Sequence, residues 1–158
     1  MTTISTLGDW TGAIARARAH APYLAHGLDR LPGLESLLAA GAIEEALDWA
    51  RAAGHGAATV ASALRREKLA LATALAIGDL AGALPLLRIT GELSDFADRS
   101  LDAAIADAIR ARVPDAEPAG FLALALGKHG AQELNYSSDI DPILLYDPAL
   151  LPRRQRDE

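Results

Sequence analysis

The spacing of the apolar residues changes once along this chain, close to residue 113, and this change constrains the fold more than any other feature. Before it, apolar side chains recur at multiples of the helical turn, as in Leu64, Leu71 and Leu75, which is typical of an amphipathic helix. After it, they form two short runs, at residues 121–126 and 143–146, which are typical of strands. The sequence therefore predicts a mainly α fold with a C-terminal α+β fragment.

Glycine and proline residues indicate where the helices begin and end. Gly41 and Gly54 stand where a left-handed C-cap is expected, and Gly78 is expected to end the next helix. Asp79 is expected to cap a short turn ahead of Pro85. The predicted helices cover residues 10–29 with an interruption at Pro22, 34–40, 43–53, 57–77 and 85–112, followed by a proline-containing linker over 113–119. A break at residues 90–91 is the alternative for the last helix.

Composition excludes several classes of protein. Of the 158 residues, 51% are hydrophobic and only 4% are aromatic, which favours helices over a β-sandwich. The absence of cysteine excludes disulfides, thiolate chemistry and zinc–cysteine sites. A net charge of −6 argues against a general nucleic-acid-binding surface. No apolar run reaches membrane-spanning length and the N-terminus shows no targeting signal, so we expect a cytoplasmic protein with no membrane partner.

Asp139 and Asp141 flank Ile140 at the start of the second apolar run. Successive side chains of a strand point to opposite faces, so the two carboxylates are expected to share a face. Carboxylates that converge repel each other unless a cation lies between them, which makes this pair a candidate Mg²⁺ site. The alternative is that the acids only mark the end of a strand. Pro142 lacks a ladder donor and predicts an edge strand or an irregular start.

A turn that contains Gly127 and Gly130 connects the two apolar runs. Glycine lets backbone N–H groups approach phosphate oxygens, and Lys128 adds a positive charge beside them, although an ordinary turn is the alternative. Ser138 could donate to a phosphate or cap the turn that precedes Asp139. The histidines show no ligand spacing and are expected at the surface or in turns: His20, His26, His55 and His129.

Residues 127–141 resemble the signature of the glutamine synthetase adenylyltransferase family, within the nucleotidyltransferase superfamily that includes DNA polymerase beta. The family pattern runs G-x-G-K-L-G-G-x-E-L-N-x-S-S-D-I-D-L. The matching residues are Gly127, Lys128, Gly130, Glu133, Leu134, Asn135, Ser137, Ser138, Asp139, Ile140 and Asp141. The departures are Ala125 and Ala131 for glycine, and His129 and Pro142 for leucine. Residues 79–98 are similar to the helical region before this signature, which reads D-L-A-G-L and then E-L-S-x-L-A-D.

This resemblance implies both a fold and a site. The fold would be an N-terminal helical module at residues 1–116, followed by the first strands of a polymerase-beta-like nucleotidyltransferase domain at residues 117–158. The cofactor would be Mg²⁺. The implied site residues are Asp139 and Asp141 as catalytic metal ligands, and Gly127, Lys128, Gly130 and Ser138 as the nucleotide- and phosphate-binding turn.

The resemblance also implies an activity. Family members carry two such domains, of which the first removes AMP from a tyrosine of glutamine synthetase by phosphorolysis and the second adds AMP from ATP. The helical lead before the motif resembles the first, deadenylylating domain, and the direction of AMP transfer stays open. The implied ligands are ATP, ADP and phosphate, and the implied partners are glutamine synthetase and the PII signalling protein, in the regulation of nitrogen assimilation.

Sites of this kind need a third acid from a later strand, and residues 147–158 contain no acid in a strand context. We therefore expect a partial chain that is inactive alone, with unpaired strand edges that favour dimerisation or aggregation. Two other interpretations stay open. One is a non-catalytic helical regulatory or interaction module, and the other is a nucleotidyltransferase that acts on a different hydroxyl substrate.

Overall fold

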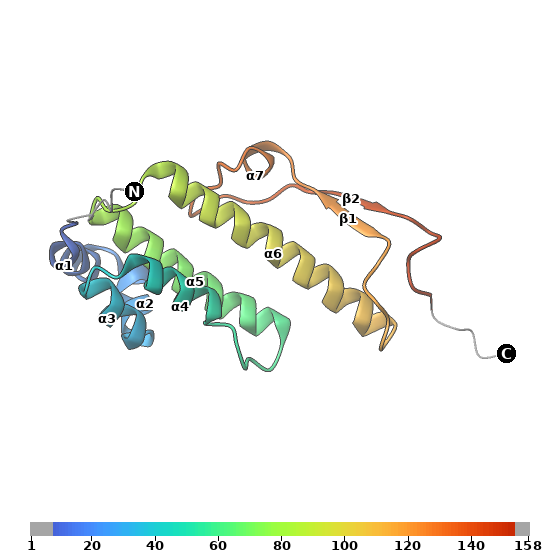
Figure 1. The fold of residues 1–158 in the computed structure, drawn as a ribbon, viewed down its shortest axis with the longest axis horizontal. Coiled ribbons are helices and arrows are strands. Elements are labelled where there is room, and N and C mark those ends of the chain that lie inside the picture. Colours follow the sequence, from blue (N-terminus) through green and yellow to red (C-terminus); the bar gives the residue numbers. More distant parts are fainter. Residues whose placement is uncertain (1–7, 154–158) are drawn as a thin grey trace, which may run out of the picture. The chain divides into compact units, whose positions relative to one another are not determined.

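The structure, a computed structural model, describes residues 8–153 and divides into two compact units. The first unit ends at Ile89 and the second begins at Thr90. Most described residues are helical, with a single pair of strands near the C-terminal end of that range, so the predicted fold class is confirmed (Figure 1). The predicted domains, residues 1–116 and 117–158, stay a prediction, because a division by compactness does not test which part folds alone.

The first unit is a helical assembly with α5 at its centre. Its helices are α1 (Trp10–His20), α2 (Pro22–Arg30), α3 (Pro32–Ala39), α4 (Ile43–Ala52), α5 (Val60–Leu80) and the first residues of α6 (Leu86–Arg112). α5 packs against each of α1, α2, α3 and α4. The largest fully buried aliphatic side chains of this unit are Leu28, Leu34, Leu38, Leu47, Leu71, Leu75 and Ile77. The helical spacing of these residues therefore produces the expected apolar core.

α5 begins and ends later than the sequence predicts. Thr59 accepts a hydrogen bond from the N–H of Ser62, and the Ser62 hydroxyl accepts one from the N–H of Thr59, so a capping box fixes the start. The helix runs through Gly78, where an added Cβ would lie 2.7 Å from Leu84 Cδ1. Gly78 is therefore a point of close packing inside the helix, and the prediction that the helix ends there is wrong. Asp79 lies inside the helix, and its predicted capping role is wrong.

The two predicted glycine C-caps have different outcomes. Gly41 has φ +73° just after α3, as a left-handed cap requires, and this prediction is confirmed. Gly54 has no positive φ, and the left-handed residue of that connection is Gly56, with φ +71°. An added Cβ on Gly54 would lie 2.9 Å from the carbonyl oxygen of Ala63, so this glycine permits close approach of the α5 backbone.

The second unit consists of the remainder of α6, β1 (Phe121–Leu124), the one-turn helix α7 (Gly127–Gly130) and β2 (Ile143–Tyr146). α6 continues through Gly91 without the alternative break at residues 90–91. β1 and β2 pair antiparallel, with Phe121 opposite Tyr146 and Leu124 opposite Ile143. The connection between these two strands contains every predicted site residue. Among the described residues, no helix is both long enough and apolar enough to cross a membrane.

Candidate functional site

The predicted glycine turn is the one-turn helix α7, and its geometry favours glycine at both ends. Gly127 has φ +57°, a conformation that side-chain-bearing residues rarely adopt. An added Cβ on Gly130 would lie 2.6 Å from the carbonyl oxygen of Ala125, which is closer than a real Cβ can approach. Gly127, Lys128 and Gly130 are all exposed. The turn therefore presents its backbone and its one lysine to solvent.

α7 ends in a Schellman motif. The N–H of Glu133 donates to the carbonyl oxygen of Lys128 at 2.7 Å, and the N–H of Gln132 donates to that of His129 at 3.0 Å. Gln132 has φ +59°, so a non-glycine residue occupies the left-handed position. Ala131, one of the departures from the family pattern, therefore does not prevent a tight turn, because the left-handed residue is the next one along the chain.

His129 is buried, and its predicted location at the surface is wrong. Only 2% of the residue is exposed, and its Nε2 lies 2.8 Å from Oδ1 of Asp98 on α6. A buried imidazole needs a hydrogen-bond partner, and Asp98 supplies one from a half-exposed position. The ring Nδ1 is buried without a partner. The other histidines, His20, His26 and His55, are exposed as expected.

Residues 135–138 form a second turn that leads to the two acids. The hydroxyl of Ser138 accepts a hydrogen bond from the N–H of Asn135 at 3.0 Å, and Oδ1 of Asn135 accepts one from the N–H of Ser137 at 3.0 Å. These two bonds are typical of turns that are stabilised by short polar side chains. Ser138 therefore caps the turn in this structure. Its contact with a phosphate stays a prediction.

Asp139 and Asp141 lie in irregular chain that precedes β2. The strand itself begins at Ile143, which agrees with the irregular start predicted from Pro142. Both acids are exposed, whereas Ile140 and Pro142 are half-buried. This alternation of burial is that expected of extended chain, even though the two acids form no strand pair. Their role as metal ligands stays a prediction. In residues 8–153 the structure contains no group of three or more His, Asp or Glu side chains that could hold a metal ion.

A comparison with known families assigns this chain. The family model described as glutamate-ammonia ligase adenylyltransferase matches residues 11–157, which is nearly the whole chain. The chain belongs to this family. Among curated members, a bifunctional glutamine synthetase adenylyltransferase/adenylyl-removing enzyme of Caulobacter vibrioides is 41% identical over an alignment of 163 positions, which covers 89% of this chain and 16% of the relative. One of Xanthobacter autotrophicus, with the same name, is 44% identical over 114 residues, which cover 65% of this chain and 12% of the relative.

This adenylyltransferase-family chain is much shorter than the relatives that it matches. It spans about a sixth of the length of the Caulobacter relative, so the activity of the whole relative does not transfer to it directly. No solved structure matches the chain.

The hydrogen bond between His129 and Asp98 is the feature of this family member that the sequence did not reveal. The two residues are 31 positions apart, and no spacing rule relates a helix to a distant turn. The available signal was the leucine that the family pattern has at position 129. A position that holds leucine is usually buried, so a histidine there needs a buried partner.

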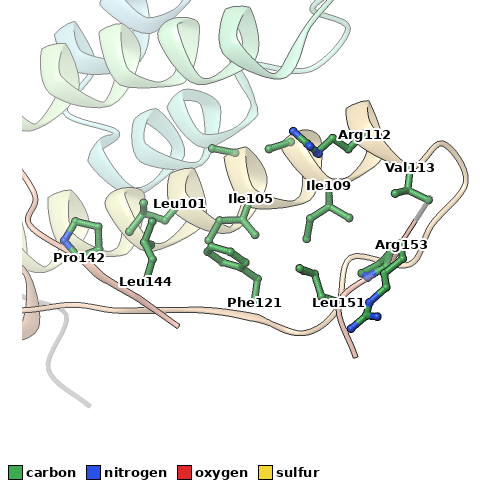
Figure 2. Close-up of a pocket in the computed structure, with 13 residues that line it drawn as sticks. Leu101, Ile105, Ile109, Arg112, Val113, Phe121, Pro142, Leu144, Leu151 and Arg153 are labelled. Atoms are coloured by element: carbon green, nitrogen blue, oxygen red, sulfur yellow. The ribbon is translucent and has the colours of Figure 1, made fainter. Parts of the chain in front are cut away.

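The second unit has an apolar hollow that is lined by none of the predicted site residues. A cavity of about 680 Å³ separates the apolar face of α6 from the strands. Figure 2 shows Leu101 and Ile105 of α6 turned toward Phe121 of β1 and Leu144 of β2. None of the six predicted site residues lines it. The cavity is therefore not part of the predicted site.

Proposed function

We propose that this chain supplies the metal- and phosphate-binding segment of a Mg²⁺-dependent nucleotidyltransferase that removes AMP from, or transfers it to, a tyrosine of glutamine synthetase. One observation carries the proposal: a turn whose backbone geometry favours glycine at Gly127 and Gly130 leads, within the region that the family model matches, to the exposed acids Asp139 and Asp141. The names of the relatives support the substrate, since they are called bifunctional glutamine synthetase adenylyltransferase/adenylyl-removing enzymes.

The two acids have the donor chemistry that Mg²⁺ requires. Mg²⁺ prefers oxygen ligands and is usually held by one or two carboxylates together with substrate phosphates and water. Asp139 and Asp141 are exposed and supply carboxylate oxygens without a cage of protein ligands around them. When bound, the metal would neutralise charge on the phosphate oxygens and on the leaving oxygen.

The residues of the glycine turn would position the nucleotide. Gly127 and Gly130 leave the backbone uncovered, so its N–H groups could approach phosphate oxygens closely. Lys128 lies between them, is exposed, and carries a positive charge that would attract a polyphosphate. Ser138 caps the second turn and so helps to set the position of Asp139, the next residue. Catalysis of this kind depends on positioning and on charge stabilisation more than on covalent chemistry.

The wider role follows from the same proposal. The nucleotide ligands would be ATP or ADP with phosphate, the protein partners glutamine synthetase and the PII signalling protein, the location the cytoplasm, and the process the regulation of nitrogen assimilation. A third metal-binding acid would come from chain outside these 158 residues. Incubation of the isolated chain with adenylylated or unmodified glutamine synthetase is therefore expected to give no AMP removal or transfer, and robust turnover would contradict this.

A titration with Mg²⁺ tests the proposed site. Replacement of either carboxylate, by Asp139→Asn or Asp141→Asn, should weaken Mg²⁺ binding by at least about tenfold, because each variant removes one charged ligand from a site that has few. The matched control is Asp147→Asn, which also removes one negative charge from this region. Asp147 accepts a hydrogen bond from the N–H of Ala149 through Oδ1, and asparagine keeps that acceptor. Calorimetry on the four proteins gives the affinities.

The titration also separates the proposal from its alternatives. Equal, weak Mg²⁺ binding by the wild type and the two variants would favour a non-catalytic regulatory or interaction module. A nucleotidyltransferase with another hydroxyl substrate would give the same titration as the proposal. That alternative is separated by testing whether a longer polypeptide that contains this segment modifies purified glutamine synthetase.

A further inference from the structure

Two residues on one face of α6, Ser94 and Asp98, are bonded to the segment that carries the glycine turn. Thr90, Ser94 and Asp98 follow one another at intervals of four residues, so they lie one helical turn apart on the same side of α6. The Ser94 hydroxyl donates to the carbonyl oxygen of Thr90 at 2.8 Å and accepts from the N–H of Leu134 at 3.4 Å. Asp98 binds His129 at 2.8 Å. Residues 129 and 134 are therefore attached to adjacent turns of the same helix.

The contact with Asp98 fixes the direction of α7. His129 is the buried residue of this one-turn helix, while Lys128 and Gly130 on either side of it are exposed. An ionised carboxylate can only accept hydrogen bonds, so Nε2 of His129 carries the proton and donates to Oδ1 of Asp98. A short helix of four residues has little packing of its own to set its direction. The bond between His129 and Asp98 therefore holds one side of α7 against α6 and leaves Lys128 facing solvent.

The buried Nδ1 of His129 strengthens this interpretation. This atom has no hydrogen-bond partner in the structure. The ring is consequently held by a single polar contact, and loss of that contact would leave both ring nitrogens unsatisfied in a buried place. The turn should be sensitive to the one side chain that supplies the contact.

We propose that Asp98 and Ser94 are positioning residues that hold the Gly127–Gly130 turn and the residues after it on α6, through His129 and Leu134, with Lys128 aimed at the phosphate. Only the aim of Lys128 at the phosphate rests on the proposed function, and the attachment of the turn to α6 does not. Neither residue is proposed to touch the nucleotide. Asp98 acts through His129, and Ser94 acts through the backbone of Leu134.

Hydrogen exchange of the 158-residue chain tests the attachment without any ligand. With Asp98→Ala, exchange of the amides of residues 127–134 should rise by about tenfold or more, because a hydrogen bond to a charged group is lost. Asp98→Asn keeps an acceptor oxygen and should restore protection close to that of the wild type. Ser94→Ala, which changes little volume, should raise exchange at residues 132–134 by a smaller factor. The matched control is Asp95→Ala, an exposed acid on the same helix, which should leave these amides unchanged.

Several outcomes would overturn the attachment. The first is unchanged exchange at residues 127–134 in Asp98→Ala. The second is loss of protection in Asp98→Asn equal to that in Asp98→Ala. The third is a rise spread evenly over α6 and the strands, which would indicate general destabilisation in place of local positioning. Should Asp98→Ala not fold, the position-specific response of Ser94→Ala decides.

A titration with Mg·ATP tests whether Lys128 is aimed at the phosphate, and it separates this role from the proposed function. Asp98→Ala should weaken Mg·ATP binding by about five- to tenfold, and Asp98→Asn and Asp95→Ala should not. Equal Mg·ATP affinity in Asp98→Ala, despite a loosened turn, would overturn the positioning role toward the phosphate. No Mg·ATP binding by the wild type, together with the expected exchange pattern, would instead contradict the proposed function and leave the attachment of the turn supported.

Discussion

Gln132 shows how the segment around the site tolerates strain at a single residue. It occupies the left-handed position of the Schellman motif with φ +59°, where glycine is the usual residue. An L-residue pays about 1–2 kcal/mol for this conformation. Glycine removes that cost, but it makes the unfolded chain more flexible, which lowers the stability of the fold by about 0.4–1 kcal/mol.

Gln132→Gly is therefore expected to stabilise the chain by about 0.5 kcal/mol, the difference between these two effects. Equilibrium denaturation in urea gives the change in the free energy of unfolding. The control is Asn135→Gly, which has no left-handed strain to relieve and loses the acceptor of the Ser137 N–H, so it should destabilise. A destabilising effect of Gln132→Gly would show that the glutamine side chain makes a compensating contact.

At the same scale, the sequence identifies residues by local chemistry and misses distant partners. Gly127 and Gly130 could be recognised because a local backbone requirement determines both. The role of Asn135 and Ser138 in the turn follows from side chains that bond within three residues. His129 could not be placed, because its partner Asp98 comes from another element, 31 residues earlier.

At the scale of the elements, the glycines inside helices differ in their surroundings: some are closely packed and one faces open space. Gly78 lies inside α5, and Leu84 packs closely against it. Gly27 in α2 is buried, and an added Cβ there would collide with Oγ1 of Thr73 on α5. Gly91 in α6 has nothing within 4 Å of an added Cβ. The sequence alone cannot separate these cases, since each is a glycine within an apolar helical pattern.

The pair Gly27→Ala and Gly91→Ala tests this distinction. Gly27→Ala should destabilise by about 1–2 kcal/mol, because overpacking of a buried helix contact outweighs the gain in helix propensity. Gly91→Ala should stabilise by about 0.5–1 kcal/mol, since open space lets the gain in propensity appear in full. Thermal denaturation of both variants gives the two signs. Equal effects in the same direction would contradict the packing account.

At the scale of the whole molecule, the two strands expose large apolar side chains. Leu122 is 59% exposed, Leu145 48% and Tyr146 65%. The two strands form a sheet with no further partner among the described residues. Exposed edges and apolar faces of this kind promote pairing between chains.

The isolated chain is therefore expected to self-associate through its strands. Leu122→Lys combined with Leu145→Lys places two charges on directly opposed residues of one sheet face, so it should shift the equilibrium toward the monomer by about tenfold or more. Tyr23→Lys, on an exposed residue of α2, is the control and should leave association unchanged. Sedimentation over a range of concentrations measures the equilibrium. A clean wild-type monomer at high concentration would contradict the prediction.

Asp139 and Asp141 are proposed to hold a divalent cation beside the glycine turn at residues 127–130. Mn²⁺ can replace Mg²⁺ at oxygen-rich sites and broadens the NMR signals of nearby nuclei, so a titration with Mn²⁺ locates the bound ion. The account predicts that broadening begins in the amides of residues 127–130 and 138–141, and that Asp139→Asn together with Asp141→Asn abolishes it. Broadening that begins elsewhere, or that survives in the double variant, would contradict the account.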